Sequence, residues 1–180
     1  GWSDPADRLN AVLENDELEL YCQPIRGLIG AETYPMAEVL VRMREEEKAL
    51  LPPGLFLPLF EHHRMMPHLN RWVLRKAAAH LSHGSKIPRL TLNLSGQTID
   101  DAAFPDFVAG EVRAAGIGAG AVLFEIDEAD LIARPQASSL LAAALNRGGS
   151  GVVLDSWTVG QFRARISFFR STEDHAGRFH

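Results

Sequence analysis

This 180-residue chain has few cysteines, no long apolar runs and no excess of basic residues. Cys22 is the single cysteine, which excludes an internal disulfide and fits a reducing compartment. No run approaches the roughly 18 apolar residues of a membrane span, and no secretory signal is present. A net charge of −5 argues against a nucleic-acid polymer as partner, because such proteins present a basic face. We therefore expect a cytoplasmic domain, tied to a membrane only through other domains of a parent protein.

The composition is that of a globular domain, with 46% hydrophobic and 23% charged residues. Several short apolar segments are separated by helix-like stretches, so they are typical of successive strands in a parallel α/β array. Each carries a carboxylate or an amide: the segments 37–43, 90–95, 122–127 and 152–155 contain Glu38, Asn93, Glu125 and Asp155. The carboxyl ends of parallel strands meet on one face. Oxygen ligands gathered there suit Mg²⁺, Mn²⁺ or Ca²⁺ better than zinc.

The remaining elements follow from capping residues and apolar spacing. Asp4 and Pro5 begin a lead-in helix over residues 1–16, since both residue types favour a helix start. A first strand is expected from Glu17 to Ile25. The expected helices cover residues 55–62, 67–83, 104–115 and 137–147. Gly116 closes the third of these helices, as glycine commonly does.

The order and context of these segments resemble the EAL domain family of bacterial cyclic-di-GMP phosphodiesterases and their inactive relatives. The signature tripeptide stands as Glu38-Val39-Leu40, followed by Arg42. The other segments that carry the resemblance are Tyr21–Ile25, Pro53–Pro58 with Arg71–Leu74, Asn93–Gln97, Glu125–Glu128 and Asp155–Gly160. Each motif alone is weak, but together, in this order, they are specific. The resemblance implies a TIM-type (β/α) barrel whose first five units lie in residues 17–160.

The barrel expected from this resemblance is incomplete, because a TIM barrel takes roughly 250 residues. Residues 161–180 match nothing expected after Gly160 and are left unassigned. Either the barrel continues through residues that this sequence lacks, or strands one and five are open edges. Open edges predict a dimer, or a cover supplied by Phe162, Phe168 and Phe169. They also predict that the apolar side chains of Leu18, Leu20, Val152 and Leu154 are wetted.

The resemblance also implies roles for individual residues. Glu38, Asn93, Glu125 and Asp155 correspond to ligands of Mg²⁺ or Mn²⁺. Glu38 and Glu128 correspond to catalytic residues, Glu128 as the acid that steadies a loop near the site. Gln23, Leu40, Arg42 and Ser95 lie where contacts to cyclic-di-GMP are expected. Because alternate strand residues share a face, Glu38, Leu40 and Arg42 point together. A guanidinium presents paired donors to phosphate, whereas carboxylates need a cation between themselves and the phosphate.

Some of these residues also have purely structural interpretations. Glu38 and Arg42 could form an ion pair inside the barrel, and Asn93 could be a structural amide. Glu128 could be an acid favoured by the dipole at the start of a helix.

Departures from the family pattern bear on activity. Ser156 stands where active members have a second metal-binding aspartate, and the lysine strand expected after it is missing. The sequence therefore predicts a degenerate phosphodiesterase that binds cyclic-di-GMP in signal transduction, with little or no hydrolysis, and acts on a protein partner or as a homodimer. One alternative is a protein-interaction module that no longer binds nucleotide. Another is an active phosphodiesterase whose catalytic C-terminal part is absent from this sequence.

Overall fold

The computed structural model describes residues 4–27, 33–44, 54–85, 87–155, 166–168 and 177–178. Within these ranges the helices are α1 (Pro5–Glu14), α3 (Phe56–His62), α4 (Met66–Ser82), α5 (Gly96–Ile99), α6 (Phe104–Ala115), η1 (Ala119–Ala121), α7 (Glu128–Ala133) and α8 (Pro135–Arg147). The strands are β1 (Leu18–Gly27), β2 (Thr33–Met43), β3 (Arg89–Leu94), β4 (Val122–Asp127), β5 (Gly151–Asp155), β6 (Ile166–Phe168) and β7 (Gly177–Arg178). None of the helices in these ranges has the length and apolar character that a bilayer crossing requires.

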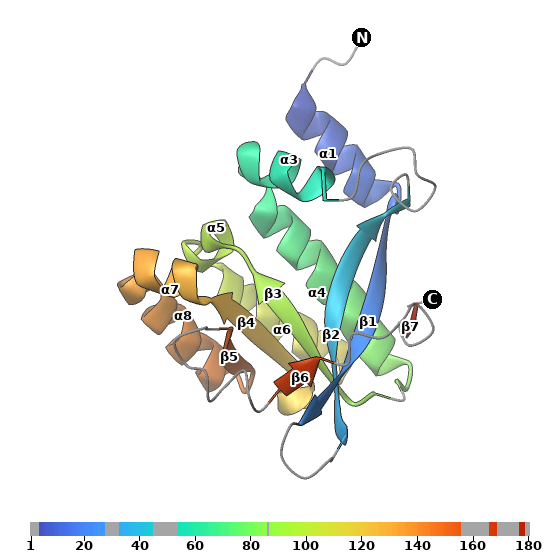
Figure 1. Cartoon of the computed structure of the whole chain (residues 1–180), viewed down its shortest axis with the longest axis vertical. Helices are drawn as coiled ribbons and strands as arrows, with labels where there is room; N and C mark the ends of the chain where they lie inside the picture. The colour runs from blue at the N-terminus through green and yellow to red at the C-terminus, as the bar shows by residue number, and fades with distance from the viewer. Residues whose placement is uncertain are drawn as a thin grey trace.

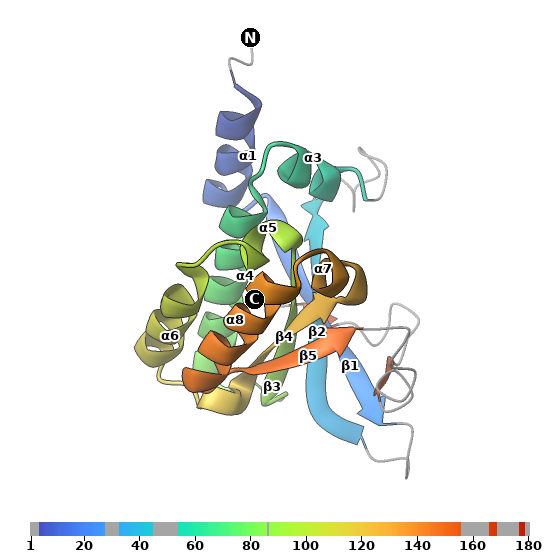
Figure 2. The ribbon, with the colours of Figure 1, turned by 90° about the vertical axis from the view of Figure 1, so that its left-hand side faces the viewer.

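The strands form one sheet in the order β5-β4-β3-β2-β1-β6, with β7 also paired to β1. Strands β2, β3, β4 and β5 run parallel to one another, as predicted for the four segments that carry a polar residue. Helices α4, α6 and α8 lie against one face of this sheet (Figures 1 and 2). The fold is therefore an α/β array, and the second face of the sheet carries none of these three helices.

The first strand does not belong to the parallel array, which corrects the expectation of five successive βα units. Strand β1 pairs with β2 antiparallel, with Leu18 opposite Met43 and Gln23 opposite Glu38. The reason is the connection, which consists of residues 28–32 alone. A parallel connection needs a crossover of a dozen or more residues, whereas a short connection produces an antiparallel pair.

The first strand is not the open, wetted edge that one of the two alternatives predicted. Strand β1 has antiparallel partners in β6 and β7. Leu18 and Leu20 are each only 3% exposed and belong to the hydrophobic core. Their neighbours across the hairpin, Met43 and Val41, pack into the same core. Phe162 and Phe169 lie outside the described residues, as does the side chain of Phe168, so the role of the three as a cover stays a prediction.

The core explains which face of the sheet is available for a site. The ring of Phe124 on β4 meets the ring of Phe104 on α6 edge-to-face, with centroids 5.7 Å apart. Phe124 therefore points to the helices, together with its strand neighbours Val122 and Ile126, which are buried. Because alternate residues of a strand face opposite sides, Glu125 and Asp127 point away from the helices.

Candidate functional site

The centre of the candidate site is a hydrogen bond between neighbouring strands. Asn93 on β3 donates from Nδ2 to Oε1 of Glu38 on β2 at 3.1 Å. Glu38 is half-buried and Asn93 is exposed. An amide that donates its nitrogen to a carboxylate keeps its oxygen as an acceptor or metal ligand. The structure thus brings together two of the residues assigned to one site by sequence alone.

The strand register extends this pair into a row across the sheet. Gln23 on β1 stands opposite Glu38, and Asn93 stands opposite Glu125 on β4. The backbone of Asp155 lies opposite Asp127, two residues further along β5 than Val153, which stands opposite Glu125. Its side chain lies outside what the structure describes, as does Ser156. Four predicted residues therefore follow one another on adjacent strands, and the fifth is placed by its backbone.

Glu125 is more deeply buried than Gln23, Glu38 and Asn93, at 3% exposure. It points away from the helix-covered face, as Phe124 shows. A buried carboxylate needs hydrogen bonds, a counter-charge or a bound cation to offset the loss of water.

The residues predicted to contact the ligand are accessible to different degrees. Arg42 is exposed at the carboxyl end of β2, and its Nη1 donates to the carbonyl oxygen of Val41 at 2.9 Å. Leu40 and Gln23 are half-buried. The burial pattern agrees with the prediction that Glu38, Leu40 and Arg42 share a face, because Ala37, Val39 and Met43 between and beside them are buried.

Ser95 has a structural role that the sequence did not indicate. Its Oγ accepts a hydrogen bond from the backbone N–H of Thr98 at 3.3 Å, which caps the short helix α5. Its own N–H donates to Oδ1 of Asn70 at 3.4 Å. Ser95 therefore fixes the turn that follows Asn93, and its predicted contact with a ligand stays a prediction.

Asn70 is a supporting residue that sequence reasoning missed. It is 7% exposed, on the buried side of α4. Its Nδ2 donates to the carbonyl oxygen of Asn93 at 3.2 Å, and its Oδ1 also accepts from the hydroxyl of Thr98 at 2.5 Å. The sequence feature that could have indicated it is an amide residue on a helix between the core residues Leu69 and Trp72. Asn70 ties the end of β3 to the helix layer and so holds Asn93 in place.

A second group of charged residues surrounds the loops after β3 and β4. Asp127 caps α7 by accepting a hydrogen bond from the N–H of Ala129 at 2.9 Å, and Glu128 occupies the first turn of that helix. Burial raises the pKa of Asp130, Arg134 opposes this rise, and the carboxylates of Asp127, Glu61 and Asp100 add to it. The rim of the candidate site is therefore acidic, with Arg134 as the neighbouring cation.

The donor set suits a hard divalent cation. Carboxylate and amide oxygens of Glu38, Asn93 and Glu125 are the ligands that Mg²⁺ and Mn²⁺ prefer. Across the described ranges, no cluster of three or more His, Cys, Asp and Glu side chains is arranged to hold a metal ion. Asn93 carries an amide and is therefore not counted in such a cluster, and the side chain of Asp155 lies outside the described residues. The oxygen donors of Glu38, Asn93 and Glu125 therefore fit the chemistry of such a cation, and Asp155 stays a predicted ligand.

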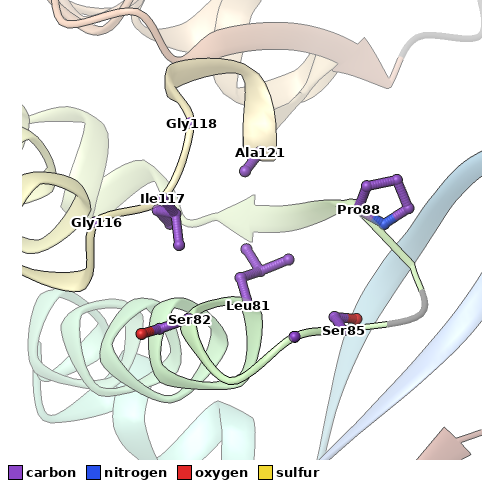
Figure 3. Close-up of a pocket in the computed structure, with 9 residues that line it drawn as sticks. Leu81, Ser82, Ser85, Pro88, Gly116, Ile117, Gly118 and Ala121 are labelled. Carbon is purple, nitrogen blue, oxygen red and sulfur yellow. The ribbon is translucent and has the colours of Figure 1, made fainter.

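A separate hollow of about 270 Å³ lies at the opposite end of the sheet (Figure 3). It is bounded by the end of α4, the turn after α6 and the residues that precede β3 and β4. The lining residues are Leu81, Ser82, Gly84, Ser85, Pro88, Gly116, Ile117, Gly118 and Ala121. Active sites of parallel βα folds lie at the carboxyl ends of the strands, so this hollow is not part of the candidate site.

Two named relatives are similar to this chain in sequence. The chain is 30% identical over 158 residues to cyclic di-GMP phosphodiesterase PdeB of Shewanella oneidensis, covering 86% of this chain and 18% of PdeB. It is 30% identical over 159 residues to cyclic di-GMP phosphodiesterase NbdA of Pseudomonas aeruginosa, covering 86% of this chain and 20% of NbdA. The chain thus spans about a fifth of the length of these relatives.

Solved structures agree with the fold. The FimX EAL domain from Pseudomonas aeruginosa bound to c-di-GMP matches with a TM-score of 0.75 at 20% identity, covering 92% of this chain and 69% of that one. The PaMucR phosphodiesterase in complex with c-di-GMP matches with a TM-score of 0.73 at 24% identity, covering 85% of this chain and 63% of that one. The α/β fold is therefore that of the EAL structures, of which this chain covers a part.

The pattern that defines the family described as "EAL domain" matches residues 6–166. This match covers most of the chain, including nearly all of α1 and all of the row from Gln23 to Asp155. It agrees with the named relatives and with the solved structures. The chain belongs to the EAL domain family.

Proposed function

We propose that this domain binds cyclic-di-GMP as a signalling receptor and hydrolyses it little or not at all. The observation that carries the proposal is the hydrogen bond between Glu38 and Asn93 on the face away from the helices, in register with the buried Glu125. Parallel folds bind ligands at the carboxyl ends of their strands. Named relatives and structural neighbours that act on or bind this nucleotide support the choice of ligand.

In this proposal a divalent cation, Mg²⁺ or Mn²⁺, would be held by Glu38, Asn93, Glu125 and Asp155. The cation would supply positive charge between these carboxylates and a phosphate of the nucleotide. Arg42, exposed on the same face as Glu38, would donate to phosphate oxygens. Gln23, Leu40 and Ser95 would complete the contacts with the ligand. We assign these roles to the EAL-like units of residues 17–160, which follow the lead-in segment 1–16, and residues 161–180 stay unassigned.

Low hydrolysis follows from the sequence after β5. A pair of metals accelerates phosphodiester cleavage by stabilising both the attacking and the leaving oxygen. Ser156, in place of a second aspartate, offers a hydroxyl where a carboxylate would hold the second cation. One cation can bind the phosphate without supplying that pair. Glu128 would then act as a residue that orders its loop.

The second candidate function is an active phosphodiesterase. The names of PdeB, NbdA and PaMucR, which describe phosphodiesterases, favour it. A third candidate, a protein-interaction module without nucleotide, is favoured by the exposed leucines of the α3 region, Leu55, Leu57 and Leu59. A binding measurement combined with a product measurement separates the three.

Calorimetric titration of the chain with cyclic-di-GMP, with and without Mg²⁺, tests the proposal. We expect saturable binding that strengthens when Mg²⁺ is present, and no linear dinucleotide in the cell after the titration. Saturable binding with steady formation of the linear product would favour the active enzyme. A flat titration in both conditions would contradict the proposal and favour the interaction module.

A further inference from the structure

One guanidinium connects the two loops that flank the candidate site. Arg134 lies between α7 and α8, and its Nε donates to Oδ2 of Asp100 at 2.9 Å. Its Nη1 donates to Oδ1 of Asp130 at 3.3 Å. Asp100 ends α5, which follows β3, and Asp130 lies in α7, which follows β4. The loop after Asn93 is thus joined to the loop after Glu125.

Gly96, at the start of α5, leaves the space that the Arg134 side chain occupies. A Cβ added at Gly96 would lie 2.5 Å from Nη1 and 2.7 Å from Cζ of Arg134, and 2.7 Å from Oδ1 of Asp130. These contacts are with the outer ends of flexible side chains, so a methyl group at Gly96 would displace the ion pair rather than the core. Glycine at position 96 is what allows the guanidinium to lie against the loop.

The surrounding charge gives Arg134 more than a packing role. Burial raises the pKa of Asp130, Arg134 opposes this rise, and the nearby carboxylates of Asp127, Glu61 and Asp100 add to it. Without Arg134, like charges on the two loops repel one another. The ion pairs are partly exposed, so they contribute little to global stability. Their effect is on the relative position of the loops.

We propose that Arg134 is a positioning residue that fixes the loop of Asp127 and Glu128 relative to Asn93 and Ser95. This inference rests on the proposed function for its effect on the nucleotide. Residues that orient metal ligands and their loops commonly change metal affinity or activity by about 10–100-fold when they are mutated. Since Arg134 acts through the loops, we expect an effect near the lower end of this range.

The test compares Arg134→Gln, Arg134→Lys and Gly96→Ala with the unaltered chain. Arg75→Gln is the matched control, because Arg75 forms a comparable surface ion pair with Glu111 at 3.6 Å, between α4 and α6. Calorimetry with cyclic-di-GMP and Mg²⁺ reports affinity, and thermal unfolding reports stability. Amide hydrogen exchange over residues 96–100 and 127–134 reports the loops without any nucleotide.

We expect Arg134→Gln and Gly96→Ala to weaken binding about tenfold, while unfolding temperatures stay close to that of the unaltered chain. Arg134→Lys should restore part of the affinity, because it keeps the charge but loses the planar pair of donors. Amide exchange should become faster in both loops together in these variants. Arg75→Gln should change neither the affinity nor the exchange rates. Unchanged exchange in both loops in Arg134→Gln and Gly96→Ala would overturn the inference, as would unchanged affinity. If the unaltered chain does not bind nucleotide, the proposed function fails, and the exchange data alone decide whether Arg134 positions the loops.

Discussion

Asn93 Nδ2 lies 3.1 Å from Glu38 Oε1, and this hydrogen bond joins two strands that are far apart in sequence but adjacent in the sheet. The pair lies on the face of the sheet opposite the packed helices. The backbone carbonyl of Asn93 accepts a hydrogen bond from Asn70 on the helix side, and Glu125 stands opposite Asn93 in the strand register.

We predict that Asn93→Ala lowers the affinity for cyclic-di-GMP in Mg²⁺ by about tenfold, because it removes an oxygen ligand and the partner of Glu38. Thermal stability should change little, since Asn93 is exposed. Titration calorimetry measures the affinity, and scanning calorimetry measures the unfolding temperature. Asn146→Ala, on the exposed side of α8, is the control. Equal affinities for the Asn93 and Asn146 variants would show that Asn93 is only a structural amide.

We predict that Arg42→Ala weakens binding more than Glu38→Ala when a chelator has removed divalent cations. Without a cation, Glu38 repels the phosphate, whereas Arg42 donates charge-assisted hydrogen bonds worth roughly 1.5–3 kcal/mol, or about ten- to a hundredfold in affinity. Adding Mg²⁺ should reverse the order of the two losses. Titration of both variants in chelator and in Mg²⁺ measures this, and equal losses in chelator would contradict it.

We predict that Asn70→Ala destabilises the fold by about 1–3 kcal/mol, because it removes the buried amide that accepts from the Ser95 N–H and the Thr98 hydroxyl and donates to the Asn93 carbonyl. Urea unfolding followed by circular dichroism measures the loss. Asn146→Ala removes an amide of the same kind from an exposed position and should cost far less. An Asn70 variant as stable as the Asn146 variant would mean that the network does not hold the end of β3.

We predict that Asp130→Asn changes how stability depends on pH. The pKa of Asp130 is raised above its ordinary value of 3.8, chiefly by burial and further by Asp127, Glu61 and Asp100, against the effect of Arg134. The folded chain therefore holds this proton more tightly than the unfolded chain, so acidification toward pH 4 favours folding at this site.

The unaltered chain should accordingly lose less stability than Asp130→Asn between neutral pH and about pH 4. Urea unfolding at a series of pH values measures the difference between the two chains. Parallel curves would indicate that Asp130 has its ordinary pKa in the folded chain. A smaller loss in the variant would indicate that the shift has the opposite sign.

Local sequence signals predicted much of the fold. Strand β4 was expected at Val122–Asp127 and lies there, because its apolar run is bounded by a turn and an N-cap. The helix Phe104–Ala115 ends at Gly116, which has the positive φ of 65° that glycine accommodates. The direction of β1 was missed, although the shortness of the segment 28–32 carried that information.

The sequence indicated which polar residues come together but not what supports them. It grouped Glu38, Asn93 and Glu125 at the carboxyl ends of neighbouring strands; the structure joins Glu38 and Asn93 by a hydrogen bond and places Glu125 opposite Asn93, while their roles toward a ligand stay predictions. The contacts of Asn70 with Asn93, and of Arg134 with the Gly96 loop, join segments that are far apart in the sequence. Such pairings depend on how helices pack on the sheet, which local patterns do not encode.

The central claim is that the chain binds cyclic-di-GMP without cleaving it, and equilibrium dialysis in Mn²⁺ tests this most directly. The chain is dialysed against cyclic-di-GMP, and both chambers are analysed by chromatography for the cyclic and the linear dinucleotide. We predict that cyclic-di-GMP accumulates on the protein side and that no linear dinucleotide forms over time. Steady appearance of the linear dinucleotide, or equal concentrations of cyclic-di-GMP in the two chambers, would contradict the account.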